Sequence, residues 1–281
     1  MTRRGRSGAL LCVMILLAAT ATASEVAALR KQVVASMRLT GTLAIDAEGS
    51  VTGYAIDQPG RVPPEVLGHL ARNVPRWKLV QAPAAGEATS LPFSVRVMAA
   101  PREAGLFELS LVGATIRGKR GPGEEVVVRG GLRRPEYPRA VARLAKVTGT
   151  VYVVLKVGRR GAVEDLVIEQ VNLDFVGEPA QVAQVQAEFA AQAAAAARHW
   201  KFKLPVAGAL AAEPFLTVRV PVRYVADMLP RYGQWEYYLP GPRRVAPWMQ
   251  EDIAVGAGEE GVPELLGAGP RLLTPLEPPA G

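Results

Sequence analysis

The sequence has few of the residues that build disulfide frameworks and metal sites. It has 281 residues, of which one is cysteine and two are histidine. One cysteine cannot close an intramolecular disulfide, and a cysteine-rich zinc site needs several thiolate ligands. Two histidines also leave little for a histidine metal cluster. We therefore expect a protein without a disulfide framework, a metal ion or a cofactor.

Sequence motifs of common hydrolases are missing as well. The sequence contains no G-x-S-x-G or S-x-x-K nucleophile motif and no H-E-x-x-H zinc motif. A match to G-x-G-x-x-G at residues 256–261 lies in a glycine-rich tail, and its glutamates would repel a phosphate. We therefore predict no catalytic residues. The alternative is an enzyme whose cleft gathers Asp46, Asp57 and Glu65.

The first residues are typical of a secretory signal peptide. Three arginines lie within the first six residues, an apolar stretch runs from Leu10 to Ala19, and small residues at positions 21 and 23 precede Ser24. The apolar stretch is shorter than the ~20 residues that cross a bilayer. Removal of residues 1–23 takes away Cys12 and three arginines, so the formal charge becomes +7 − 3 = +4.

This leader predicts a protein exported to the periplasm. Nucleic acid is then not an expected partner for the remaining basic charge. Contact with a membrane is expected only if the leader stays uncleaved, in which case the protein would lie at the periplasmic side of the inner membrane.

Two regions of the remaining chain have similar sequence patterns. Met37–Gly49 aligns with Gly149–Gly161, each with strand periodicity and a final glycine at a tight turn. A second strand follows each turn, at residues 50–57 and 162–171, so both regions predict a β-hairpin.

Each predicted hairpin is followed by a helix, a tryptophan and a last strand. The helices are expected at Pro64–Asn73 and Pro179–His199, the tryptophans are Trp77 and Trp200, and the strands are expected at Pro92–Met98 and Pro214–Tyr224. The interval from Trp77 to Val95 is 18 residues, and so is that from Trp200 to Val218. A short helix is expected before each hairpin, at Glu25–Ser36 and Tyr137–Lys146. This order predicts an internal duplication, with the tryptophans as core residues.

The expected fold is α+β, with two units that each hold a three-stranded antiparallel sheet covered by one or two helices. The units span residues 24–100 and 133–225. The linker, residues 101–132, has short strands at Phe107–Val112 and Val126–Arg129. The tail, residues 226–281, is rich in proline and glycine and is predicted to be largely disordered, although its acidic second half could fold back onto a basic region.

The second unit resembles the C-terminal domain of TonB family proteins. The motifs that carry the resemblance are P-E-Y-P at Pro135–Pro138, G-T-V-Y-V-V-L-K-V at residues 149–157, the turn at Gly161, A-A-R-H-W-K-F at Ala196–Phe202 and V-R-V-P-V-R-Y at residues 218–224. The resemblance covers about residues 133 to 225. The first unit resembles a degenerate copy that lacks the Tyr-Pro pair.

The resemblance implies a periplasmic domain with two helices on a three-stranded sheet. It also implies binding of a protein or an extended peptide, such as a segment of an outer-membrane transporter, by strand addition to the sheet edge. The last strand fits this role because Pro221 removes one backbone donor, which is tolerated at an edge. The expected partner-binding residues are Arg134, Tyr137, Phe215, Thr217, Val218, Arg219, Val220, Val222 and Tyr224.

The sequence departs from TonB transducers in three respects. Its leader is of a cleavable type, and no long proline-rich spacer precedes either unit. Arg134 also stands where the family has glutamine. Simple binding is therefore favoured over energy transduction. A signal-anchored transducer and a scaffold that forms a homodimer through uncovered edge strands remain the alternatives.

Overall fold

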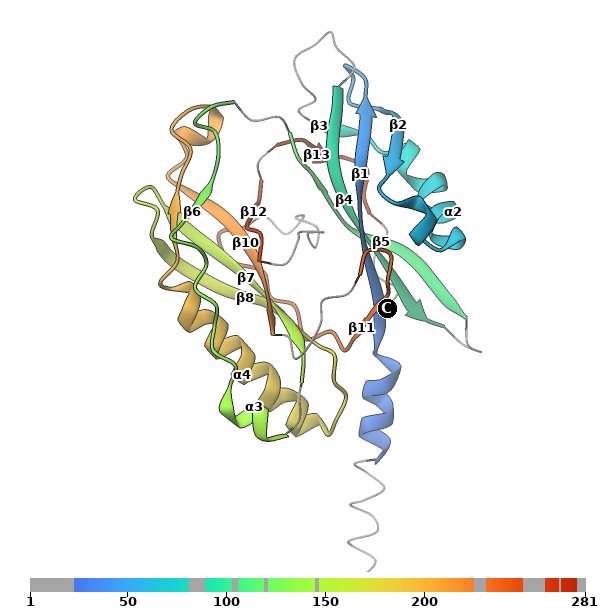
Figure 1. The fold of residues 1–281 in the computed structure, drawn as a ribbon, viewed down its shortest axis with the longest axis vertical. Coiled ribbons are helices and arrows are strands. Elements are labelled where there is room, and N and C mark those ends of the chain that lie inside the picture. Colours follow the sequence, from blue (N-terminus) through green and yellow to red (C-terminus); the bar gives the residue numbers. More distant parts are fainter. Residues whose placement is uncertain are drawn as a thin grey trace, which may run out of the picture.

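The computed structural model describes residues 23–80, 89–102, 106–118, 121–144, 147–224, 231–249, 261–267 and 269–276. They form a mixed α+β fold of antiparallel sheets and helices, which confirms the predicted fold class (Figure 1). The predicted leader lies outside these residues except for Ala23, which begins a helix that runs to residue 31. Within the described ranges, no helix is long and apolar enough to span a bilayer.

Five strands form the first sheet, and one helix covers it. They are β1 (Val34–Ile45), β2 (Val51–Ile56), β4 (Thr89–Pro101), β5 (Phe107–Ile116) and β11 (Glu236–Tyr238), and the helix is α2 (Pro64–Asn73). Strand β1 is central: β4 pairs along one side of it, while β2 and β11 pair with different parts of the other side. Strand β5 lies beyond β4. Helix α2 closes the core with apolar residues on its inner face, including Val66 and Leu70.

The second sheet has four strands and two helices. The strands are β7 (Gly149–Gly158), β8 (Val163–Leu173), β10 (Phe215–Tyr224) and β12 (Glu264–Leu265), and the helices are α3 (Arg139–Leu144) and α4 (Pro179–Ala197). The strand order is β12-β10-β7-β8. Helix α4 starts with a capping box between Glu178 and Gln181, which satisfies free backbone donors of the first turn. Its buried face, with Val185 and Phe189, packs on the sheet.

Short elements complete the structure. They are the 3-10 helices η1 (Pro59–Arg61), η2 (Val74–Arg76) and η4 (Ala209–Ala211) and the strands β3 (Leu79–Val80), β6 (Val127–Arg129), β9 (Lys201–Lys203) and β13 (Arg271–Leu272). Strand β3 pairs with β13, and β9 pairs with β6. Both linker strands expected from the sequence are therefore present, β5 in the first sheet and β6 beside the second.

The predicted helices agree with the structure to different degrees. Helix α2 has the predicted bounds, whereas α4 ends two residues earlier than predicted, at Ala197. The helix expected at Tyr137–Lys146 corresponds to α3, which begins two residues later, at Arg139; residues 145 and 146 lie outside the described ranges. The helix expected at Glu25–Ser36 ends at residue 31, because the following residues begin β1.

The two hairpin turns have the same local geometry. Gly49 and Gly161 have φ angles of +81° and +76°, which disfavour any side chain. The carbonyl of Gly49 accepts a hydrogen bond from the backbone of Leu79, and that of Gly161 accepts one from Phe202. The two tryptophans predicted as core residues are buried, at 3% and 2% exposed.

The pairing of the last strands differs between the two units. Leu39 faces Val95 across β1 and β4. Val151, which the repeat alignment places opposite Leu39, faces Val222 and not Val218. The equal 18-residue intervals therefore do not mark equivalent positions, and the duplication stays a prediction.

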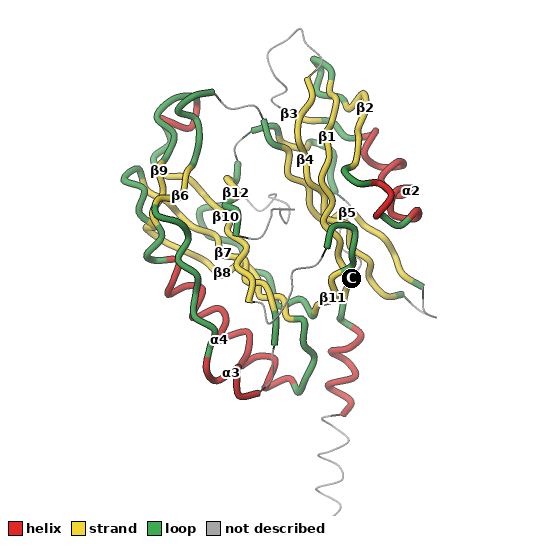
Figure 2. The backbone as a smooth tube through the Cα atoms, viewed as in Figure 1, coloured by secondary structure: helices red, strands yellow, loops and turns green. Residues whose placement is uncertain are grey.

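The tail is more ordered than its composition predicts. Its described parts, residues 231–249, 261–267 and 269–276, include β11, β12 and β13, which pair with β1, β10 and β3. The tail thus joins both sheets (Figure 2). The expected disorder is wrong for these residues. A strand of two or three residues needs no periodicity of its own, because an existing sheet edge supplies the backbone partners.

Candidate functional site

Strand β10 divides its side chains between two faces. Its even-numbered residues from Leu216 to Tyr224 are all buried in the core that faces α4. Its odd-numbered residues point to the opposite face, as expected for period-2 alternation. The side chains of the predicted partner-binding residues Val218, Val220 and Val222 therefore lie in the core and not on the opposite, polar face of the sheet.

The backbone of β10 alternates in the same way between its two neighbours. The Leu266 amide donates to the Thr217 carbonyl at 2.9 Å, and Arg219 pairs with Glu264 in the same register. Odd residues therefore direct their backbone groups outward to β12, and even residues such as Val218 direct theirs to β7. Pro221 is an odd residue, so its missing N–H leaves the β7 ladder intact. Its carbonyl accepts from the Gly261 amide at 2.8 Å.

The predicted open edge at β10 is therefore wrong for the isolated chain. Tail residues 261–266 cover the edge from Thr217 to Pro221. The sequence analysis placed β10 as the last strand of the sheet because the tail shows no strand periodicity. The edge position was correct with respect to the second unit alone, since no strand of residues 133–224 pairs on that side.

Arg219 is the largest buried side chain of the edge and is only 1% exposed. Its Nε and Nη2 atoms donate to the two carboxylate oxygens of Glu169 at 2.7 and 2.8 Å, a two-bond pairing. Its Nη1 atom lies 3.5 Å from Oε2 of Glu264 in the tail. Arg219 therefore joins β8, β10 and β12 on one face of the sheet.

A β-bulge turns Glu169 toward this arginine. The β7–β8 register passes from Tyr152 opposite Gln170 to Val153 opposite Ile168, so Glu169 is an additional residue in β8. Its backbone carbonyl accepts from the Arg244 amide, at 2.8 Å, instead of from β7. The bulge lets Glu169 reach the face on which Arg219 lies.

Two more residues complete the cluster. The Arg243 guanidinium donates to Oε1 of Glu169 at 3.1 Å. Oε1 of Glu264 accepts a short hydrogen bond from the hydroxyl of Thr115 in β5. Glu264 thus links the second sheet to the first. Together, Arg219 and Arg243 balance the charges of Glu169 and Glu264.

The neighbouring carboxylates keep the Arg219 guanidinium protonated. Burial lowers the pKa of its guanidinium, but the charges and hydrogen bonds of Glu169 and Glu264 raise it by more, so the net shift is upward. A buried cation that cannot lose its proton must keep carboxylate partners.

The other residue of β12 faces the opposite way. Leu265 lies opposite Val218 and packs against the core of the second unit. The short strand therefore places an acid on the polar face of the sheet and an apolar side chain on the core face.

The remaining predicted site residues lie elsewhere. The Tyr137 hydroxyl donates to the Val147 carbonyl at 2.6 Å, and its ring meets Phe189 and Tyr224 edge-on. Burial raises the pKa of Tyr137, and the bond to Val147 opposes this shift. Tyr137 and Tyr224 are thus core residues near α4, not contacts at the outer edge. Arg134 is exposed ahead of α3.

Phe215 lies at the start of β10, where its ring carries the Lys156 ammonium 4.5 Å above its centre. Sequence reasoning missed the cluster of Glu169, Glu264, Arg243 and Thr115. The acidic tail was a signal for a fold-back contact, but the basic region expected to receive it, Arg129–Arg160, does not include Arg219.

The three acids of the enzyme alternative have local roles. A carboxylate oxygen of Asp46 accepts from the Ser50 amide, Asp57 accepts from the Thr40 hydroxyl, and Glu65 is exposed in the first turn of α2. No described group of three or more His, Cys, Asp or Glu residues is arranged to hold a metal ion.

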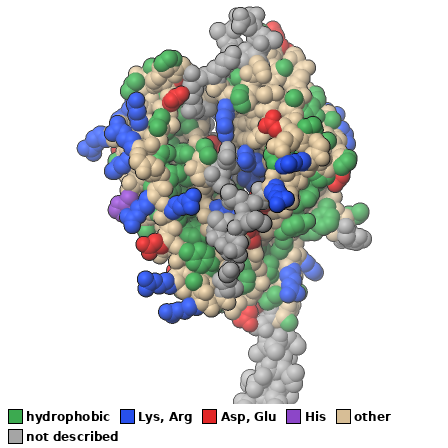
Figure 3. Space-filling model, in the orientation of Figure 1, with side chains coloured by type: hydrophobic (Ala, Val, Ile, Leu, Met, Phe, Trp, Pro, Cys, Tyr) green, Lys and Arg blue, Asp and Glu red, His purple; other side chains and the backbone are tan. Residues whose placement is uncertain are grey.

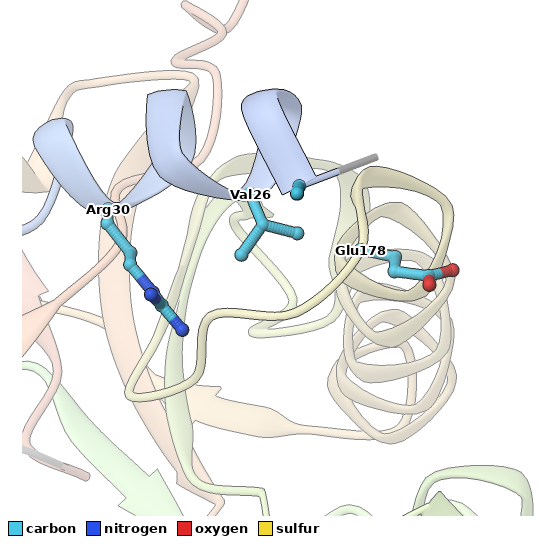
Figure 4. A pocket seen from close by; sticks show the side chains of 4 residues that line it. Val26, Arg30 and Glu178 are labelled. Atoms are coloured by element: carbon cyan, nitrogen blue, oxygen red, sulfur yellow. The ribbon is translucent and has the colours of Figure 1, made fainter. Parts of the chain in front are cut away.

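A shallow cavity of about 310 Å³ lies between the helix of residues 23–31 and the start of α4. Ala23, Val26, Arg30 and Glu178 line it. Figure 4 shows that the Glu178 side chain points away from Arg30, so the two do not converge on one position in the cavity. A site for small-molecule chemistry needs such convergent polar groups. The β10 edge and its charged cluster are therefore the candidate site.

Comparison of the chain with protein-family models, curated proteins and solved structures gave no match.

Proposed function

We propose that this chain is a non-enzymatic periplasmic protein that binds an extended segment of another protein by strand addition at the outer edge of β10. The observation that carries the proposal is that this edge already holds an extended segment, tail residues 261–266, through backbone hydrogen bonds. The tail would then be the occupant of the edge when no partner is bound. The resemblance to TonB C-terminal domains favours the same strand, and the leader favours the periplasm.

The first sheet offers a useful comparison. There, β5 pairs with β4 from Phe93 to Pro101, with one register shift between Arg96 and Val97. In the second sheet, β12 pairs with β10 only at Val218 and Arg219, with flanking hydrogen bonds from Gly261 and Leu266. A short strand with few backbone bonds opens at a much lower free energy than a long one. The β10 edge is therefore the more suitable of the two for exchange with a partner.

The test uses the full chain with a weakened tail. The double substitution Glu264→Ala and Leu265→Ser removes both side-chain anchors of β12 and leaves β10 unchanged. A fluorescent peptide with the sequence of residues 261–267, GVPELLG, is then added, and its anisotropy is measured. We expect binding to this variant and much weaker binding to the unmodified chain, because a tethered segment competes at an effective concentration of about a millimolar or more.

Adding Thr217→Pro to the weakened variant tests the backbone. It replaces the outward N–H with a proline ring next to the carbonyl that accepts from the Leu266 amide, and it leaves the N–H groups that face β7 in place. We therefore expect the fold to survive and peptide binding to fall at least about tenfold. Thr217→Val keeps the N–H and is the matched control. Equal binding by the proline and valine variants, with unchanged circular dichroism, would rule out strand addition here.

A further inference from the structure

The charged cluster beside β10 has a consequence for the kind of segment that the edge accepts. We infer that the site selects an extended segment in which an acidic residue lies opposite Arg219 and an apolar residue follows it. This rests on the proposed function and deepens it, because it gives the chemistry of the partner.

The first argument concerns charge. When Glu264 leaves with the tail, Arg219 loses one of the two carboxylates that contact it among the described residues, and the other, Glu169, also pairs with Arg243. Arg243 is partly exposed, whereas Arg219 is 1% exposed, so a neutral segment over the edge would leave the Arg219 guanidinium with fewer charged partners and no access to water, which is unfavourable. A segment with a carboxylate opposite Arg219 restores the balance that Glu264 provides in the isolated chain.

The second argument concerns the register. Leu265 packs against the core of the second unit, while Glu264 faces the charged cluster on the other face. A shift of the added strand by one residue would move the acid to the core face and the leucine to Arg219. The two adjacent side chains therefore fix the register of the segment together.

The third argument concerns the surrounding surface. In Figure 3, Lys and Arg side chains line much of the left side of the molecule, over the second unit. Without the predicted leader, residues 1–23, the chain carries a formal charge of +7 − 3 = +4. Such a surface attracts acidic segments and raises their rate of association.

The experiment compares two peptides on the same full-length variant, Glu264→Ala with Leu265→Ser. The peptides are GVPELLG and GVPQLLG, which differ only by a carboxylate and an amide. We expect GVPELLG to bind about tenfold more tightly or better, since a charge-assisted hydrogen bond is about twice as strong as a neutral one and is buried here. The preference should persist at high salt, because buried pairs are screened little.

A second variant tests the same idea without weakening the apolar anchor. Glu264→Gln alone should loosen the tail, so that added GVPELLG binds more tightly than it does to the unmodified chain. Leu273→Ser, an exposed substitution elsewhere in the tail, is the control and should leave binding unchanged.

The outcomes separate the two proposals. Tighter binding of GVPELLG supports both. Equal binding of the two peptides overturns the acidic preference and leaves strand addition standing. If neither peptide binds to the weakened variant, the proposed function is overturned, and the tail is a permanent part of the fold.

Discussion

At the scale of single residues, the main feature is the buried ion pair of Arg219 and Glu169, because burial of two charges costs solvation free energy. The two side chains are 1% and 3% exposed, so neither is solvated by bulk water. Their two-bond geometry and the contacts with Glu264 and Arg243 offset that loss. We expect a buried pair of this kind to determine how the strands and the tail pack together more than it adds to the free energy of unfolding.

Replacing Glu169 with glutamine should destabilise the fold. The amide removes the negative charge that pairs with both Arg219 and Arg243, so we expect a loss of about 3 kcal/mol in the free energy of unfolding. Urea unfolding followed by circular dichroism measures it. Glu164→Gln, on the exposed part of the same strand, is the control and should change the value by less than about 0.5 kcal/mol. Similar values for both variants would mean that the cluster does not stabilise the fold.

At the scale of elements, β12 matters because it is so short. Its two residues take their stability from the edge of β10 and from the side chains of Glu264 and Leu265. Residues Val218 and Leu265 form a non-hydrogen-bonded antiparallel pair, in which the Cα atoms lie about 4.5 Å apart. This separation is within the range of a disulfide.

A reversible lock follows from this pair. In a chain with Cys12→Ser, the substitutions Val218→Cys and Leu265→Cys should form a disulfide that holds the tail on β10. We expect the oxidised protein to bind added GVPELLG at least about tenfold less than the reduced protein, because the bound tail cannot leave. Anisotropy with and without reductant measures it, and each single cysteine variant is the control. Equal binding in both redox states would show that the peptide binds elsewhere.

The sequence predicted the long elements well and the candidate site only in part. Periodicity and proline placement gave the hairpins and α2, and Pro221 indicated the outer side of β10 correctly. The β-bulge at Glu169 was not predictable, because one additional residue hardly changes the alternation of apolar and polar residues in a short strand. Strand β12 was not predictable either, since two residues carry no period and their partners lie far earlier in the chain.

At the scale of the whole molecule, the tail holds the two sheets together. Besides its strands, the Tyr232 hydroxyl donates to the Thr40 carbonyl at 3.2 Å, and Glu236 accepts from Arg223 of the second sheet at 3.2 Å. The tail therefore has contacts with both units at several points. This arrangement explains why a proline- and glycine-rich segment adopts a defined course without a core of its own.

The predicted export belongs to this scale as well. We expect the protein isolated from a periplasmic fraction to begin at Ser24, because small residues at positions 21 and 23 form the expected cleavage site. Intact-mass spectrometry checks this directly. A mature protein that retains residues 1–23 would favour the anchored transducer alternative.

The carboxylate of Glu264 contacts Arg219 of one sheet and Thr115 of the other. If a carboxylate of a bound partner replaces Glu264 at Arg219, the hydrogen bond between Glu264 and Thr115 of β5 is lost as well. Capture of a partner would thus remove one of the contacts that join the two sheets, and binding at the β10 edge could shift how the sheets sit against each other.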